Sequence, residues 1–210
     1  TLNMQTKQKG EKLYIVCDKD QLDENGSMQI FSLIDKLSAE LSIVKDENQK
    51  KNLLIHRAIA HSVLRDFEAA IQDFDDYLKL DDHNALAYWA RAVCQMEMDE
   101  FHVAEGQPIL NVHSAEADLS DAIRLSNNNN AYIYYNRANL HAKRKELSKA
   151  IDDYTMAIKI DNRLAEAYYN RGIARSKSGN KAAAIQDLSK AGELGLYDAY
   201  SVIKRLNKQK

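Results

Sequence analysis

The stretch AYYNRGIARSKSGNKAAAIQDL, residues 167–188, has a close counterpart earlier in the chain, IYYNRANLHAKRKELSKAIDDY, residues 133–154. The matching letters are displaced by 34 residues throughout. A fixed period of this length is typical of repeat architectures in which each repeat is one supersecondary unit. Following the period along the chain gives four copies, of which the second holds about 11 extra residues; they are residues 51–84, 85–130, 131–164 and 165–198.

Large and small residues alternate at fixed places within each copy. Counted from the first residue of the copy, position 4 is large and position 8 small, while position 20 is small, 24 large and 27 mostly small. In the fourth copy these residues are Tyr168, Gly172, Ala184, Leu188 and Ala191. Spacings of this kind place residues on one helical face, so each copy is predicted to be two amphipathic helices. One pair cannot bury its own face, and stacked pairs therefore predict a solenoid.

These residues resemble the signature of the tetratricopeptide repeat (TPR) family, and the resemblance covers residues 51–198. It implies an all-α fold, a right-handed superhelix of four helix pairs with capping helices. One departure recurs, because the family's usual proline at position 32 is replaced by Asp82, Asn127, Asn162 and Leu196. Polar residues are therefore expected to end most of these helices. The closing run AGELGLYDAYSVIKRL is similar to that of bacterial TPR proteins, which suggests a bacterial source.

Both flanks of the repeats carry further segments. Residues 27–50 and 199–210 show helical apolar stripes without the repeat signature, as expected of capping helices. Residues 1–26 include the strand-like KLYIVC without a partner strand, so an extended or irregular arm and the remnant of an upstream domain both stay open. The predicted organisation is an arm at 1–26, an N-terminal capping helix at 27–50, TPR 1 at 51–84, TPR 2 with its insertion at 85–130, TPR 3 at 131–164, TPR 4 at 165–198 and a C-terminal capping helix at 199–210.

The insertion, residues 96–114, separates the two predicted helices of the second copy. Pro108, the only proline, should break any helix that runs through it. The first helix is expected to continue to about residue 100, with Ile109, Leu110 and Val112 packed down in the loop that follows. A loop that covered the binding groove would gate access to it.

No catalytic motif is found in the chain. It has no phosphate-binding glycine loop, HExxH, nucleophile elbow or CxxC pair, so no catalytic residue, cofactor or metal site is predicted. The net charge of −2 argues against a dedicated nucleic-acid binder, and no apolar run approaches the length of a membrane span. Cys17 and Cys94 are expected to be free thiols. Neither cysteine indicates a compartment, so the localisation is left unknown: a soluble chain of the bacterial cytoplasm and, if a signal was removed upstream, of the periplasm both stay open.

A charged pair recurs in every copy, with arginine at position 7 and aspartate at position 23. An arginine whose stem packs on the core and whose head meets a carboxylate would satisfy both charges at the edge of the core. Whether each arginine pairs within its own copy or with the preceding one is open. The residues are Arg57, Arg91, Arg137 and Arg171, with Asp73, Asp118, Asp153 and Asp187.

The resemblance places the binding surface on the concave side, which the first helix of each TPR lines with positions 2, 5, 6, 9, 12 and 13. Position 5 gives an apolar row, and exposed aromatic rings in a groove are typical peptide anchors; packing of the rings between neighbouring helices is the alternative. Asparagine amides can bond a peptide backbone, and lysines can receive acidic groups. The candidate groove residues are Ile55, Trp89, Tyr132, Tyr135, Asn136, Asn139, Lys143, Tyr169, Asn170, Ile173, Lys177 and Lys204.

A sharper version of this site is the carboxylate clamp by which some TPR co-chaperones hold the C-terminal Glu-Glu-Val-Asp of heat-shock proteins. Asn139, Asn170 and Lys204 match that pattern in this chain. Tyr135 and Tyr200 stand where the clamp requires basic residues. The clamp is therefore incomplete.

Charge is distributed unevenly along the chain. Residues 1–130 hold 13 basic and 23 acidic residues, whereas residues 131–210 hold 16 and 8. This asymmetry favours acidic partners at the C-terminal half and weak head-to-tail self-association at low salt. The alternative is that it only reflects solvated helix faces and has no functional role. The predicted function is a non-enzymatic scaffold that binds a peptide or partner protein in the concave groove. The alternative is a recognition or regulatory arm of a larger enzyme or secretion assembly whose active part lies upstream of residue 1.

Overall fold

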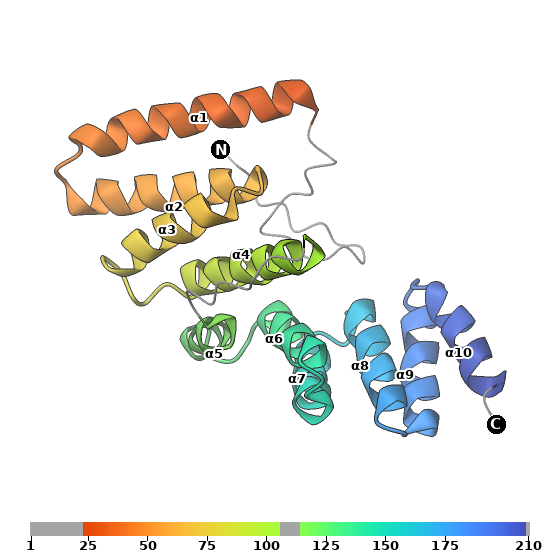
Figure 1. The fold of residues 1–210 in the computed structure, drawn as a ribbon. Helices are drawn as coiled ribbons and strands as arrows, with labels where there is room; N and C mark the ends of the chain where they lie inside the picture. The colour runs from red at the N-terminus through yellow and green to blue at the C-terminus, as the bar shows by residue number, and fades with distance from the viewer. Residues whose placement is uncertain (1–22, 106–113, 209–210) are drawn as a thin grey trace. The chain divides into compact units, whose positions relative to one another are not determined.

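The computed structural model describes residues 23–105 and 114–208, and all regular structure in these residues is α-helical (Figure 1). The predicted all-α class is therefore confirmed for this part of the chain. The helices fall in two compact units, residues 23–126 and 127–208. The first unit holds α1 (Glu24–Ile43), α2 (Glu47–Val63), α3 (Phe67–Leu78), α4 (Ala85–Ala104) and α5 (Ala115–Leu125). The second holds α6 (Ala131–Lys143), α7 (Leu147–Ile160), α8 (Ala165–Lys177), α9 (Lys181–Glu193) and α10 (Asp198–Lys208).

Within each unit, helices that follow one another in sequence pack together. In the first unit α2 pairs with α3 and α4 with α5, while α1 packs on α2 and α3 on α4. In the second unit α6 pairs with α7 and α8 with α9, while α7 packs on α8 and α10 on α9. None of the described helices combines the length and the apolarity needed to cross a bilayer.

Small residues let the two helices of a pair approach closely. Ala58 and Ala70 are fully buried between α2 and α3, where the ring of Phe74 is also completely enclosed. The approach between α8 and α9 leaves no room for a side chain at Gly172, because a Cβ added there would lie 2.9 Å from Leu188 Cγ and 3.2 Å from the Ala184 carbonyl oxygen. The small–large alternation read from the sequence is therefore the pattern of the helix-pair interface.

The turn inside three of the pairs uses one left-handed residue at the same repeat position. Arg65, Lys145 and Gly179 have φ angles of 61°, 62° and 87°. Only glycine adopts this conformation without a steric cost. The next residue caps the following helix in two of these turns, since Asp66 and Asn180 accept a hydrogen bond from a backbone N–H of α3 and α9.

Three helix limits differ from those expected from the sequence. The first two helices begin at Glu24 and Glu47, because Asp23 and Asp46 accept hydrogen bonds from the backbone N–H groups of the first turn, at 2.7 and 2.8 Å. Helix α4 continues to Ala104 instead of ending near residue 100. His102 on this extension is buried, and the helix-breaking Gly106 and Pro108 come only later in the sequence. Ile109, Leu110 and Val112 lie outside the described residues.

Candidate peptide-binding surface

Each helix pair contains one arginine–aspartate pair, and both residues come from the same copy. Both carboxylate oxygens accept a hydrogen bond from the guanidinium, at distances between 2.6 and 2.9 Å. The predicted pairing is confirmed, and the carboxylate is that of the same copy. The pairs are Arg57 with Asp73, Arg91 with Asp118, Arg137 with Asp153 and Arg171 with Asp187.

Three of these arginines also contact the helix that precedes their own pair. Nη1 of Arg57, Arg91 and Arg171 donates to Ser38 Oγ on α1, Asp75 Oδ1 on α3 and Thr155 Oγ1 on α7, at 2.9, 2.7 and 3.0 Å. The sequence did not reveal this column, because its members share only the ability to accept a hydrogen bond. Each of these guanidinium groups therefore joins three helices. This bonding holds α2, α4 and α8 at a defined rotation, which also orients their candidate groove residues.

The rings at position 5 are more buried than the sequence suggested. Trp89 and Tyr135 are only 6% and 5% exposed, so the expectation of exposed rings is wrong for both. Tyr135 packs against Tyr154 of α7, with ring centroids 6.0 Å apart. Tyr169 and Ile55 are half-buried. Trp89 belongs to the first unit and Tyr135 to the second, so the row drawn across them stays a prediction.

A hydrogen-bonded cluster links α6, α7 and α8 beside these rings. Tyr154 Oη donates to Asn139 Oδ1 at 2.6 Å, and Asn170 Nδ2 donates to Asn139 Oδ1 and to Tyr135 Oη, both at 3.1 Å. Burial raises the pKa of Tyr154, so its hydroxyl stays protonated and remains a donor. The structure thus brings two candidate groove asparagines, Asn139 and Asn170, into contact with each other.

The cluster leaves one donor group and one acceptor unused. Asn139 and Asn170 are both half-buried. Neither Asn139 Nδ2 nor Asn170 Oδ1 makes a hydrogen bond with the residues that the structure describes. An amide N–H donor and an amide oxygen acceptor therefore lie side by side on neighbouring helices.

The remaining candidates in the second unit lie on α6, α8 and α10. Tyr132, Asn136 and Ile173 are half-buried, whereas Lys143, Lys177 and Lys204 are exposed on α6, α8 and α10. Burial, assisted by the nearby charges of Asp161 and Glu166, raises the pKa of Tyr132.

Sequence reasoning missed Tyr154, which it assigned only to the core. The same position holds Phe74, Leu119 and Leu188 in the other copies. Only the third copy has a hydroxyl at this position, and this difference was the available signal, because the hydroxyl of Tyr154 bonds Asn139 of the same copy.

The surroundings of the cluster differ from those of a carboxylate clamp. Tyr135 occupies a place where the clamp needs a lysine, and its hydroxyl accepts from Asn170 instead of presenting a positive charge. The ring of Tyr200 packs directly on Gly192, where a Cβ would lie only 2.5 Å from the ring. Tyr135 and Tyr200 therefore place uncharged rings at the two positions where the clamp requires basic residues.

The helix pairs with recurring small residues define a helical-repeat protein. Residues 131–163 and 165–194 each match a model described as Tetratricopeptide repeat. The chain belongs to the tetratricopeptide repeat family.

Curated relatives carry the same repeats. The chain is 32% identical over 100 residues to the human Small glutamine-rich tetratricopeptide repeat-containing protein beta, covering 45% of this chain and 33% of that protein. It is 24% identical over 157 residues to a DnaJ homolog subfamily C member 7 homolog of Dictyostelium discoideum, covering 73% and 29%. The chain spans about a third of the length of these relatives.

Solved structures share the fold. The crystal structure of MamA has a TM-score of 0.66 at 22% identity, covering 85% of this chain and 98% of that one. YrrB, described as a TPR protein with an unusual peptide-binding site, has a TM-score of 0.63 at 17% identity, covering 86% and 89%. The first TPR of Spaghetti (RPAP3), solved with the HSP90 peptide SRMEEVD, has 0.53 at 20%, covering 65% and 98%. These likenesses confirm the predicted TPR solenoid class.

Proposed function

We propose that the chain is a non-enzymatic protein-interaction scaffold whose second unit binds an extended, acidic peptide segment across α6 and α8. The family membership and the peptide-bound TPR structure of similar fold support the general role of a scaffold. The observation that carries the specific proposal is the pair of unused amide groups on Asn139 and Asn170.

The two amide groups suit the backbone of a bound segment. An extended chain presents a carbonyl oxygen and an N–H at every residue, and both must be satisfied when they are taken out of water. Asn139 Nδ2 can donate to the carbonyl, and Asn170 Oδ1 can accept from the N–H. Tyr154 already bonds Asn139 Oδ1, and Tyr135 already bonds Asn170 Nδ2. The two asparagine side chains are therefore oriented before the segment binds, so that binding has to order few further side chains.

Charge supports an acidic segment in particular. Lys143 and Lys177 are the last residues of α6 and α8, and both are exposed. Residues 131–210 hold 16 basic and 8 acidic residues, so the potential of this unit attracts carboxylates over distances of about 10 Å at moderate salt. The half-buried Tyr169 and Ile173 add apolar surface on α8 for one or two side chains of the segment.

The test is to select binders from a displayed library of random 12-residue peptides and to measure the affinity of a selected, fluorescein-labelled peptide by anisotropy. Asn139→Asp retains the oxygen that accepts from Tyr154 and Asn170 but replaces the unused donor with a second carboxylate oxygen. We expect it to lower the affinity about tenfold or more, from the lost hydrogen bond and the added negative charge.

Asn162→Asp is the matched control, because Asn162 lies in the exposed α7–α8 turn and the charge change is the same. It should keep the affinity within about threefold, since an exposed charge at a distance is screened. Unchanged affinity in Asn139→Asp would refute the backbone-binding role of the asparagines. Selected peptides without an excess of Asp and Glu would refute the acidic preference alone.

The alternative, a recognition arm within a larger assembly, is compatible with the same surface. It is favoured by the relatives, of which the chain spans about a third. Sequencing the full gene from which this chain derives would decide it, because the alternative requires a further domain upstream of residue 1.

A further inference from the structure

The exposed large apolar side chains of the described residues are concentrated at two helices. Met28, Phe31 and Ile43 on α1 are 65%, 58% and 78% exposed, and Tyr197 and Tyr200, at the start of α10, are 73% and 49% exposed. Every other large apolar side chain for which the structure gives an exposure is buried or half-buried. A concentration of this kind marks a surface that another molecule covers.

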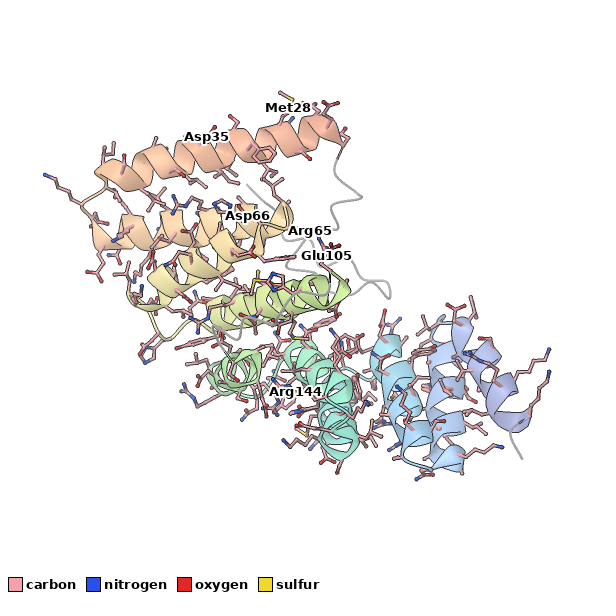
Figure 2. All side chains as sticks on the ribbon, viewed as in Figure 1. Met28, Asp35, Arg65, Asp66, Glu105 and Arg144 are labelled. Carbon is pink, nitrogen blue, oxygen red and sulfur yellow. The ribbon has the colours of Figure 1, made fainter. Side chains whose placement is uncertain are left out.

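On α1, two of these side chains lie between acidic ones. Glu24, Met28, Phe31 and Asp35 follow the spacing i, i+4, i+7 and i+11, which places them on one helical face. All four are exposed, and this face is opposite the buried Leu37. Figure 2 shows Met28 and Asp35 on the side of α1 that faces away from α2. We call these four residues the acidic stripe.

At α10, two apolar side chains, that of Tyr197 just before the helix and that of Tyr200 in its first turn, are followed by basic ones. Tyr197, Tyr200, Lys204 and Lys208 follow the spacing i, i+3, i+7 and i+11. All four are exposed, whereas Val202 packs into the core formed with α9. We call these four residues the basic stripe.

The two stripes match in spacing and are opposite in charge. Two apolar residues three positions apart are followed, four positions later, by a carboxylate on α1 and by an ammonium group on α10. If α1 of one copy and α10 of another lay side by side and ran in the same direction, three contacts would form: a methionine sulfur on a tyrosine ring, two aromatic rings packed together, and a carboxylate beside an ammonium group. The three contacts are Met28 with Tyr197, Phe31 with Tyr200 and Asp35 with Lys204.

We propose that the acidic stripe of one copy of this chain docks on the basic stripe of a second copy. Each stripe is expected to bind the opposite stripe of a second copy, because the two stripes have opposite charges and matching apolar spacing, whereas two identical stripes would repel each other. The contact is heterologous, so each copy keeps one free stripe until a ring closes or the chain of copies ends. The inference shares Lys204 with the candidate groove residues, but it uses none of the α6 and α8 residues on which the proposed peptide site rests.

The contact should be weak and sensitive to salt. A stripe of 12 residues is roughly 16 Å long, so two of them make an interface well below the roughly 1,200 Å² of stable complexes. Exposed ion pairs contribute little and are screened at high ionic strength. Association is therefore expected to be transient and to become visible only as the protein concentration is raised.

The test is sedimentation equilibrium of the full 210-residue chain without any peptide. In about 25 mM NaCl the mass average should rise above the 23.9 kDa of the monomer as concentration increases, and it should return to that value in about 500 mM NaCl. Asp35→Lys and Lys204→Glu should each abolish the rise. The double variant should restore it, because the ion pair is re-formed with its charges exchanged.

Arg205→Glu is the matched control, because Arg205 is exposed on another face of α10 and the charge change equals that of Lys204→Glu. It should keep at least half of the association seen for the unmodified chain. Three results would overturn the proposal: a monomer at every concentration in low salt, equal losses in the Lys204 and Arg205 variants, or no recovery in the double variant. Circular dichroism checks that each variant is folded, which exposed positions should allow.

Discussion

Replacing Asp187 by leucine is expected to destabilise the second unit far more than replacing its partner Arg171. The two oxygens of Asp187 accept from Arg171 Nη2 and Nε at 2.8 and 2.9 Å, and Oδ2 also accepts from Arg175 Nη1 at 2.9 Å. Arg171 is only 9% exposed. After Asp187→Leu, its guanidinium keeps only the hydroxyl of Thr155 as a hydrogen-bond partner among the described residues.

The burial of the arginine sets the size of the effect. Removing one partner of a buried ion pair leaves an uncompensated charge, which costs about 3–5 kcal/mol. Arg171→Leu removes the charge itself and leaves Asp187 with Arg175, so about 1–2 kcal/mol is expected. Asp153→Leu should fall between these values, because the side chain of its partner Arg137 is 22% exposed and water can reach it.

The assay is urea unfolding followed by circular dichroism, with Asp152→Leu as the matched control on the exposed face of α7. That control should lie within about 0.5 kcal/mol of the unmodified chain. The double variant Arg171→Leu/Asp187→Leu should recover most of the loss caused by Asp187→Leu. A loss below about 1 kcal/mol for Asp187→Leu would refute the reasoning, because an unpaired buried charge destabilises a protein by more than that. A double variant less stable than Asp187→Leu alone would refute it as well.

Three further predictions concern single side chains. The hydrogen bond from His141, followed by that from Lys149, lowers the pKa of Glu146 from 4.5. The Glu146 carboxylate therefore stabilises the fold above about pH 4.5, and this stabilisation is lost as the pH falls through the lower folded pKa. Glu146→Gln should make the acid-induced drop in melting temperature smaller. Burial raises the pKa of Cys94 to about 12, so iodoacetamide at about pH 8 should label it only after denaturation, as peptide mass spectrometry can check. Trp89→Ala should cost about 3–5 kcal/mol in thermal unfolding, because the ring is buried; an unchanged melting temperature would contradict that placement.

Local periodicity was sufficient to predict the helix pairs. Helical spacing, small residues at the contact positions and glycine or asparagine at the turns act within one copy, so the 34-residue period reports them directly. The arginine–aspartate pairs were predictable for the same reason, since both members recur in every copy. Asn139 and Asn170 were also found, because a repeat position identifies which helix face a residue occupies.

Contacts between helices decided what the sequence left open. The period could not show that Tyr135 and Trp89 are buried, because burial depends on which neighbouring side chains cover a ring. It did not reveal the further partner of Arg57, Arg91 and Arg171 on the preceding helix, since serine, aspartate and threonine accept the same hydrogen bond although they are different residue types. The hydrogen bond from Tyr154 to Asn139 depends on the packing of α7 against α6, which the sequence does not show. The repeat sequence thus determined the elements and their faces, whereas packing determined which polar groups on those faces are already satisfied and which remain available to a partner.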